Sequence, residues 1–142
     1  MMFLLDTNVI SELRKAAGGK ADPYVIAWLS GQDAAACYIS AVTLMELDLG
    51  ILLMERRDPI QGARLRTWME DYVLPEFSER TVPIDRAVAL VCARLHVPDP
   101  RPERDAFIAA SALVHGMTLA TRNVVDFAPM GVPLLNPWDQ RP

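Results

Sequence analysis

Residues 1–13 read MMFLLDTNVISEL, a short apolar run that ends at Asp6 and then becomes amphipathic. An apolar run of this length is typical of a buried strand in a parallel sheet. After Asp6, the residues Val9, Ile10 and Leu13 fall on one helical face, which predicts a helix over residues 7–15. A buried strand leading directly into a helix is the first unit of an α/β fold.

The same alternation continues along the chain. Strands are predicted over residues 36–39, 117–121 and 132–135, with a short extended piece at 80–83. Helices are predicted from residue 22, over 42–54, from 58, over 84–95 and over 102–115. Pro75 ends the helix that starts at 58 or comes just before its end. We therefore expect an α/β sandwich with a mainly parallel central sheet, formed by one domain over residues 1–142.

Two helices carry specific expectations. Residues 42–54 are apolar nearly all round, so that helix should be central in the core. A second helix has an apolar stripe at helical spacing, which packs into the core or, alternatively, receives a partner helix. The stripe consists of Leu65, Trp68, Met69, Tyr72 and Val73.

Composition limits the class of protein. The chain is 51% hydrophobic and 23% charged, which favours a packed core over disorder. The sequence contains no run of about 18 apolar residues, so no membrane span is predicted. The first residues lack the features of a signal peptide, and Cys37 and Cys92 lie in apolar surroundings. We expect a cytoplasmic protein with two buried thiols.

The charge balance argues against simple electrostatic binding of nucleic acid. The formal net charge is −4, and only two of the 14 basic residues are lysines, Lys15 and Lys20. Affinity for phosphate normally comes from Lys and Arg. A nucleic-acid enzyme with this balance needs bound cations, a local basic rim, or both.

Four acidic residues stand in apolar neighbourhoods near the predicted carboxyl ends of strands, where parallel sheets bind ligands. They are Asp6, Glu46, Asp105 and Asp126. Each also has a simpler explanation. Asp6 can cap a helix, Thr43 and Glu46 fit a capping box, Asp105 suits a first helical turn, and Asp126 suits a solvated loop.

Together, however, the four acids indicate a cation site. Two carboxylates 4 Å apart repel by about 4 kcal/mol at an effective dielectric of 20. No lysine is placed to neutralise them, and no arginine directly adjoins Asp6 or Glu46 in the sequence. Oxygen ligands select Mg²⁺, with Mn²⁺ a plausible substitute. With His96 and His115 the only histidines, zinc is disfavoured.

Four segments in register resemble the motifs of PIN-domain ribonucleases, over the whole chain. The segments are residues 4–13, 40–50, 105–110 and 121–127, and the ending at 135–138 is similar to that of the FitB-like branch of VapC-type toxins. The resemblance implies a PIN-like α/β/α sandwich and a Mg²⁺-dependent RNase that hydrolyses phosphodiester bonds as the toxin of a type II toxin–antitoxin pair.

The resemblance also assigns roles to individual residues. Asp6, Glu46, Asp105 and Asp126 match the family's acidic, metal-binding quartet. Asn8 and Thr121 match its supporting polar residues, and Arg122 is a candidate contact for substrate phosphate. Asn123 is interpreted as a helix cap and Glu12 as a surface residue.

The partners implied by the resemblance are an RNA substrate, a VapB-like antitoxin and a second copy of the chain. The homodimer would join a higher assembly with the antitoxin, which alone would contact DNA. No membrane partner is expected.

Three other classes of protein share part of this acidic pattern. A receiver domain and a haloacid-dehalogenase-type phosphatase both need a late lysine, which is absent beyond Lys20, and the phosphatase needs Asp where Asn8 stands. A PIN-like module that binds RNA or a partner without cutting it remains open, although the intact quartet argues against it.

Overall fold

The computed structural model describes residues 1–140, which form a five-stranded parallel sheet in the order β3-β2-β1-β4-β5. The strands are β1 (Phe3–Leu5), β2 (Cys37–Ser40), β3 (Thr81–Val82), β4 (Thr118–Ala120) and β5 (Leu134–Leu135). The strand that opens the chain therefore lies at the centre of the sheet, paired with β2 on one side and β4 on the other.

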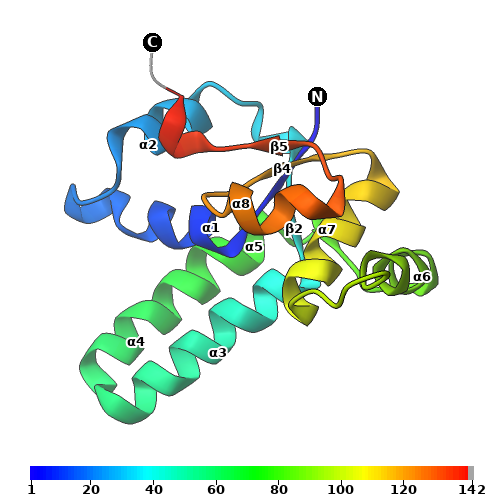
Figure 1. Ribbon diagram of the computed structural model, residues 1–142. Helices are drawn as coiled ribbons and strands as arrows, with labels where there is room; N and C mark the ends of the chain where they lie inside the picture. Colours follow the sequence, from blue (N-terminus) through cyan, green and yellow to red (C-terminus); the bar gives the residue numbers. More distant parts are fainter. Residues whose placement is uncertain (141–142) are drawn as a thin grey trace.

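Helices connect the strands and cover the sheet (Figure 1). The α-helices are α1 (Thr7–Arg14), α2 (Pro23–Ser30), α3 (Ala41–Arg57), α4 (Pro59–Trp68), α5 (Leu74–Glu76), α6 (Arg86–Leu95), α7 (Glu103–His115) and α8 (Val124–Phe127). Short 3-10 turns η1 (Ala16–Gly18), η2 (Ala34–Ala36), η4 (Ala128–Met130) and η5 (Pro137–Asp139) accompany them, and η3 (Met69–Val73) is a π-helical turn. Across residues 1–140, no helix combines the length and the apolar character needed to cross a membrane. The predicted α/β sandwich with a mainly parallel sheet is confirmed.

The two faces of the sheet bury two separate cores. Successive side chains of a strand point to opposite faces, and β1 follows this rule. Leu4 packs with residues of α6 and α7 in one core, whereas Phe3 and Leu5 pack with α1, α3 and η3 in the other. All three β1 side chains are at most 5% exposed. The sheet thus forms the middle layer of an α/β/α sandwich.

Pro75 comes just before the end of its helix, which is one of the two positions expected for it. The amide of Leu74 donates to the carbonyl of Met69, five residues earlier, and α5 then includes Pro75. Proline has no N–H to donate, and its ring clashes with the preceding turn of a regular α-helix. A wider π turn relieves that conflict. In the apolar stripe, Met69 and Val73 are buried in the core as expected.

The prediction that the helix over residues 42–54 is central was wrong. Helix α3 runs on to Arg57 and packs against α4 as an extended pair (Figure 1). Leu47 and Ile51 are buried, but Met45, Leu52 and Leu53 are 45–60% exposed. An all-apolar helix was interpreted as buried on every side, yet α3 is covered only where it meets α1, α4, α7 and β2.

The α3–α4 pair is held by a close backbone approach and a charged bridge. Gly62 lies so near α3 that an added Cβ would be 2.5 Å from Glu55 Cα. Arg66 of α4 pairs with both Asp48 and Glu55 of α3, its Nη2 lying 3.0 Å from Glu55 Oε1. The glycine allows the two helices to meet, and the arginine joins their exposed rims.

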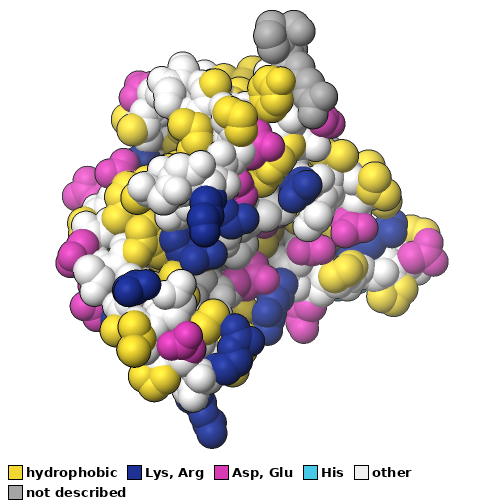
Figure 2. Space-filling view, turned by 90° about the vertical axis from the view of Figure 1, so that its left-hand side faces the viewer, with side chains coloured by type: hydrophobic (Ala, Val, Ile, Leu, Met, Phe, Trp, Pro, Cys, Tyr) yellow, Lys and Arg dark blue, Asp and Glu magenta, His cyan; other side chains and the backbone are white. Residues whose placement is uncertain are grey.

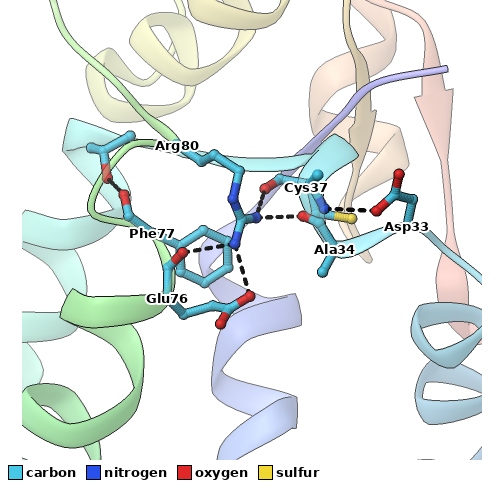
Figure 3. Close-up of polar contacts among 8 residues, drawn as sticks. Asp33, Ala34, Cys37, Glu76, Phe77 and Arg80 are labelled. Carbon is cyan, nitrogen blue, oxygen red and sulfur yellow. Dashed lines mark hydrogen bonds and ion pairs between the residues drawn. The ribbon is translucent and has the colours of Figure 1, made fainter.

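The start of β2 is attached to the segment before β3 by one arginine (Figure 3). Arg80 donates to the carbonyls of Ala34 and Cys37, and its Nη2 donates to Glu76 O and Oε1, both at 2.7 Å. Its guanidinium also lies 5.0 Å from the centre of the Phe77 ring. Arg80 satisfies carbonyls from three segments and so positions the β2–β3 edge of the sheet.

Candidate active site

The polar residues at the carboxyl ends of the central strands come together, as parallel topology requires. Asp6 follows β1, Thr121 follows β4, and Ser40 ends β2. A cleft of about 390 Å³ opens above this edge. Asp6, Glu46 and Asp105 line it, together with Asn8 and Arg122.

Asp6 is the most enclosed acid of the cleft, at 5% exposure. One carboxylate oxygen accepts the amide of Thr7 at 2.8 Å, which caps α1. The other accepts the Thr121 hydroxyl at 2.7 Å and the Asn8 side-chain amide at 3.4 Å. The simple capping role of Asp6 is therefore real, but it uses only one of the two oxygens. Thr121 and Asn8 orient the second.

Glu46 does not form the capping box that the sequence allows. The N-cap of α3 is Ser40, whose hydroxyl accepts the amide of Val42 at 3.0 Å. Glu46 lies further along the helix and accepts the Thr7 hydroxyl on Oε1 at 2.8 Å. The hydroxyl of Thr43 is 3.2 Å from the same Thr7 oxygen. Helix α1 thus holds a carboxylate that α3 presents toward the cleft.

Asp105 and Asp126 take different positions at the same edge. Asp105 stands in the first turn of α7 and lines the cleft beside Asp6 and Glu46. Asp126 stands in the short helix α8 and is exposed. It lies outside the residues that line the cleft, yet it is near enough to act electrostatically on Asp105. The structure therefore brings three acids into the cleft and leaves the fourth at its margin.

Burial and neighbouring carboxylates raise the pKa of two acids of the cleft, Asp6 and Asp105. Burial, chiefly, raises the pKa of Asp6 to about 6; hydrogen bonds from Thr121 and Thr7 lower it, and the charges of Asp105 and Glu46 raise it. Burial also raises the pKa of Asp105, with further contributions from Glu46 and Asp126. Negative charge here is unfavourable without a cation.

Basic side chains surround the acids more closely than the sequence suggested. Arg104 Nη1 is 3.7 Å from Glu46 Oε2, and the Arg122 guanidinium lies 5.3 Å from the centre of the Trp138 ring. Lys15 also lines the cleft, paired with Glu12 at 3.3 Å. No arginine adjoins Asp6 or Glu46 along the sequence, as noted above, but tertiary packing brings Arg104 to Glu46. Figure 2 shows Lys and Arg gathered beside Asp and Glu on one face.

Two supporting residues differ from their interpretation. Glu12 is only 8% exposed, and its Oε1 accepts the amide of Asp22 at 2.7 Å, which joins α1 to the start of α2. Asn123 is at the N-cap of α8, but its side chain makes no capping hydrogen bond. Its amide instead donates to Thr121 Oγ1 at 3.0 Å. Thr121 is thus the residue that connects this turn to Asp6.

The donors of the cleft fit a hydrated cation better than a closed cage. Within residues 1–140, no three Asp, Glu, His or Cys side chains are placed to hold one ion together. Mg²⁺ commonly keeps several waters and takes one or two carboxylates plus substrate phosphate. The exposed side of Glu46 and the open cleft suit that mode, and all the acidic donors are oxygens.

The sequence analysis missed Thr7 and Thr43, which hold Glu46, and Lys15 and Trp138 at the cleft wall. Thr7 could have been found, since it directly follows Asp6 on the same helix start. The other three meet the site through tertiary packing, for which the sequence carries no spacing signal.

The fold and this cleft place the chain in a known family. A family model described as the PIN domain matches residues 3–128. The chain belongs to the PIN-domain family.

Several relatives are similar over nearly their whole length. The plasmid stability protein StbB of Pseudomonas syringae is 37% identical, with 97% of this chain and 99% of the relative covered. The VapC ribonuclease Y4jK of Sinorhizobium fredii is 36% identical over the same shares. The toxin FitB of Neisseria gonorrhoeae is 34% identical, with 96% and 99% covered.

Solved structures show the same likeness. The crystal structure of FitAcB from Neisseria gonorrhoeae superposes with a TM-score of 0.88 at 34% identity, covering 97% of this chain and 99% of that chain. A structure of FitAB bound to a DNA fragment has the same TM-score and identity, covering 99% of both chains.

Proposed function

We propose that this protein is the RNA-cleaving toxin of a VapBC-type toxin–antitoxin pair and uses Mg²⁺ to hydrolyse phosphodiester bonds. The observation that carries the proposal is the cleft, where Asp6, Glu46 and Asp105 meet at the carboxyl ends of the central strands. The relatives named as a VapC ribonuclease and as a toxin support it over nearly the whole chain.

In this proposal, Asp6, Glu46 and Asp105 hold the ion, with Asp126 at the margin contributing charge or a water-mediated contact. A bound Mg²⁺ supplies a Lewis acid that stabilises charge on the phosphodiester and activates water, and Mn²⁺ substitutes for it. The side chains that surround the acids fix their geometry in advance. Thr121 and Asn8 orient Asp6, and Thr7 orients Glu46.

The basic rim explains how an acidic protein approaches RNA. Arg122 and Lys15 line the cleft, and Arg104 reaches Glu46 from α7. These residues place positive charge beside the acids, where a phosphate backbone would enter. Arg122 is the candidate substrate contact, and its position over the Trp138 ring supports that role.

The partners follow from the relatives. We propose that the chain, as a single domain over residues 1–142, forms a homodimer in the cytoplasm and is inhibited by a VapB-like antitoxin. The solved structure of FitAB bound to a DNA fragment supports DNA binding by the assembly, and we assign that contact to the antitoxin.

The test is metal-dependent cleavage of RNA by the purified chain. Cleavage should require Mg²⁺, disappear with EDTA, return with Mn²⁺ and be lost in Asp6→Asn and Asp105→Asn. Expression of the wild-type chain alone should stop growth, and Asp105→Asn should not. RNA binding without cleavage under all these conditions would favour the non-cleaving PIN-like module instead.

A further inference from the structure

A second hollow continues from the acidic cleft along α1 toward α4. Its volume is about 230 Å³, and it shares Thr7, Ser11 and Glu46 with the cleft. Its floor is apolar, formed by Ile51 and Met54 of α3 and by residues of α4. The volume is below the ~300–1,000 Å³ of pockets for drug-sized ligands. The hollow therefore suits a single ring system held next to the acids.

Three side chains around this hollow have hydrogen-bond donors that the protein does not use. Within residues 1–140, no hydrogen bond or ion pair is found for the Ser11 hydroxyl, the Arg14 guanidinium or the Trp68 indole N–H. Arg and Trp side chains are donors only. Trp68 is stacked on Tyr72, with ring centroids 6.3 Å apart, which limits its movement. All three side chains can therefore donate a hydrogen bond to a ligand in the hollow. Of the three, only the Ser11 hydroxyl can also accept one.

One of the residues that line the hollow is a glycine in the middle of helix α3. Gly50 lines the hollow, and a Cβ built on it would have no atom within 4 Å. Glycine in a helix interior costs about 1 kcal/mol relative to alanine. Packing within the chain does not require glycine at this exposed position, and the missing side chain leaves the volume above it free for a ligand.

We propose that this hollow, hereafter the base pocket, binds one unpaired base of the RNA substrate beside the cleaved phosphate, with a preference for guanine. Guanine presents two adjacent acceptors, O6 and N7, which arginine contacts through two hydrogen bonds. Adenine has a donor in place of one of them. An aromatic side chain at the pocket wall adds apolar and stacking contact. The proposal rests on the RNase function proposed above.

The direct test is titration of the metal-free protein with guanosine monophosphate, followed by NMR at the tryptophan indole N–H signals. Trp68→Phe identifies the Trp68 signal by its loss. We expect guanosine monophosphate to shift this signal, with about tenfold weaker effect from adenosine, cytidine and uridine monophosphates.

Three variants separate the base pocket from other sites. Gly50→Leu fills the pocket and should weaken binding more than tenfold while the melting temperature stays equal or rises. Arg14→Ala should weaken it about tenfold. Arg94→Ala removes an exposed arginine of α6 that lines neither hollow and should leave binding unchanged.

Cleavage mapping on a random RNA library gives the second readout. Wild type should favour guanine at one position next to the cut, and Gly50→Leu should cut with that preference lost. If the protein binds guanosine monophosphate but cuts no RNA, the base-pocket proposal stands and the proposed RNase function is rejected. Cleavage with no base preference and no Trp68 shift would reject the pocket alone. If a co-purified antitoxin shifts the Trp68 indole N–H signal and no nucleotide does, the hollow binds a protein partner. That result would overturn the proposal.

Discussion

The Thr121 hydroxyl donates to Asp6 Oδ2 at 2.7 Å, between two buried residues 115 positions apart. This hydrogen bond lowers the pKa of Asp6 against the rise caused by burial. In Thr121→Val, the pKa should move further above about 6, because the ionised carboxylate loses a partner. The acidic limb of the pH–rate profile should shift to higher pH, with about tenfold lower activity at neutral pH. Thr121→Ser keeps the hydroxyl and should behave as wild type; identical profiles for Val and Ser would contradict this role.

Asp6 should also make the metal-free protein less stable at neutral pH. Its pKa is raised from 3.8 to about 6 in the folded state, so the folded protein binds the proton more tightly than the unfolded chain. The cost is fully present above pH 6, shrinks as the pH falls through 6, and is absent below 3.8. Two pH units correspond to about 3 kcal/mol. Asp6→Asn should therefore raise the free energy of unfolding at pH 8 by up to that amount, and by little at pH 4.

Urea unfolding in EDTA at both pH values measures this difference. Addition of Mg²⁺ at pH 8 should stabilise wild type more than Asp6→Asn. A variant that is less stable than wild type at pH 8 would show that burial does not penalise the Asp6 charge.

Arg104 should compete with the cation for Glu46. Its Nη1 lies 3.7 Å from Glu46 Oε2, and both side chains are accessible to solvent. In Arg104→Ala, the Mg²⁺ concentration for half-maximal activity should fall about two- to fivefold, in line with the small value of exposed ion pairs. The KM for RNA should rise, since a positive charge beside the cleft is lost. Activity measured across a Mg²⁺ series checks this, with Arg94→Ala as the matched control.

Gly62 should be essential for the α3–α4 pair. A Cβ at residue 62 would lie 2.5 Å from Glu55 Cα and 2.8 Å from its nitrogen, both backbone atoms that cannot move aside alone. Gly62→Ala should destabilise the protein by about 1–3 kcal/mol through overpacking. Gly50→Ala, on the same pair but in open space, should stabilise it by up to about 1 kcal/mol. Thermal unfolding of the two variants should therefore change in opposite directions.

Local sequence patterns predicted a helix or strand well where the local sequence alone determines it. The apolar run before Asp6 gave a strand, and the topology of a parallel sheet brought Asp6 and Thr121 to one edge. The pattern allowed Pro75 just before the end of its helix but could not show the π turn at Met69–Val73, which depends on the packing of Met69 and Val73. Nor could it show that Met45 is exposed, because apolar character does not reveal which faces are covered.

The candidate site was predictable as a set of acids but less so as a geometry. Strand ends and the family resemblance pointed to Asp6, Glu46 and Asp105, which line one cleft. The position of Asp126 at the margin and the approach of Arg104 to Glu46 depend on how α7 and α8 pack. Their roles as metal ligands stay a prediction that the experiments above address.

The central position of β1 has a consequence for the timing of synthesis. Its partner β4 lies at Thr118–Ala120, and Thr121 reaches Asp6 only after that pairing. A nascent chain that has left the ribosome only as far as His115 lacks β4, which pairs with β1, and Thr121, which donates a hydrogen bond to Asp6. The cleavage proposed here would therefore require that residues 118–121 have been made, which gives a cell an interval in which an inhibitor can already be waiting.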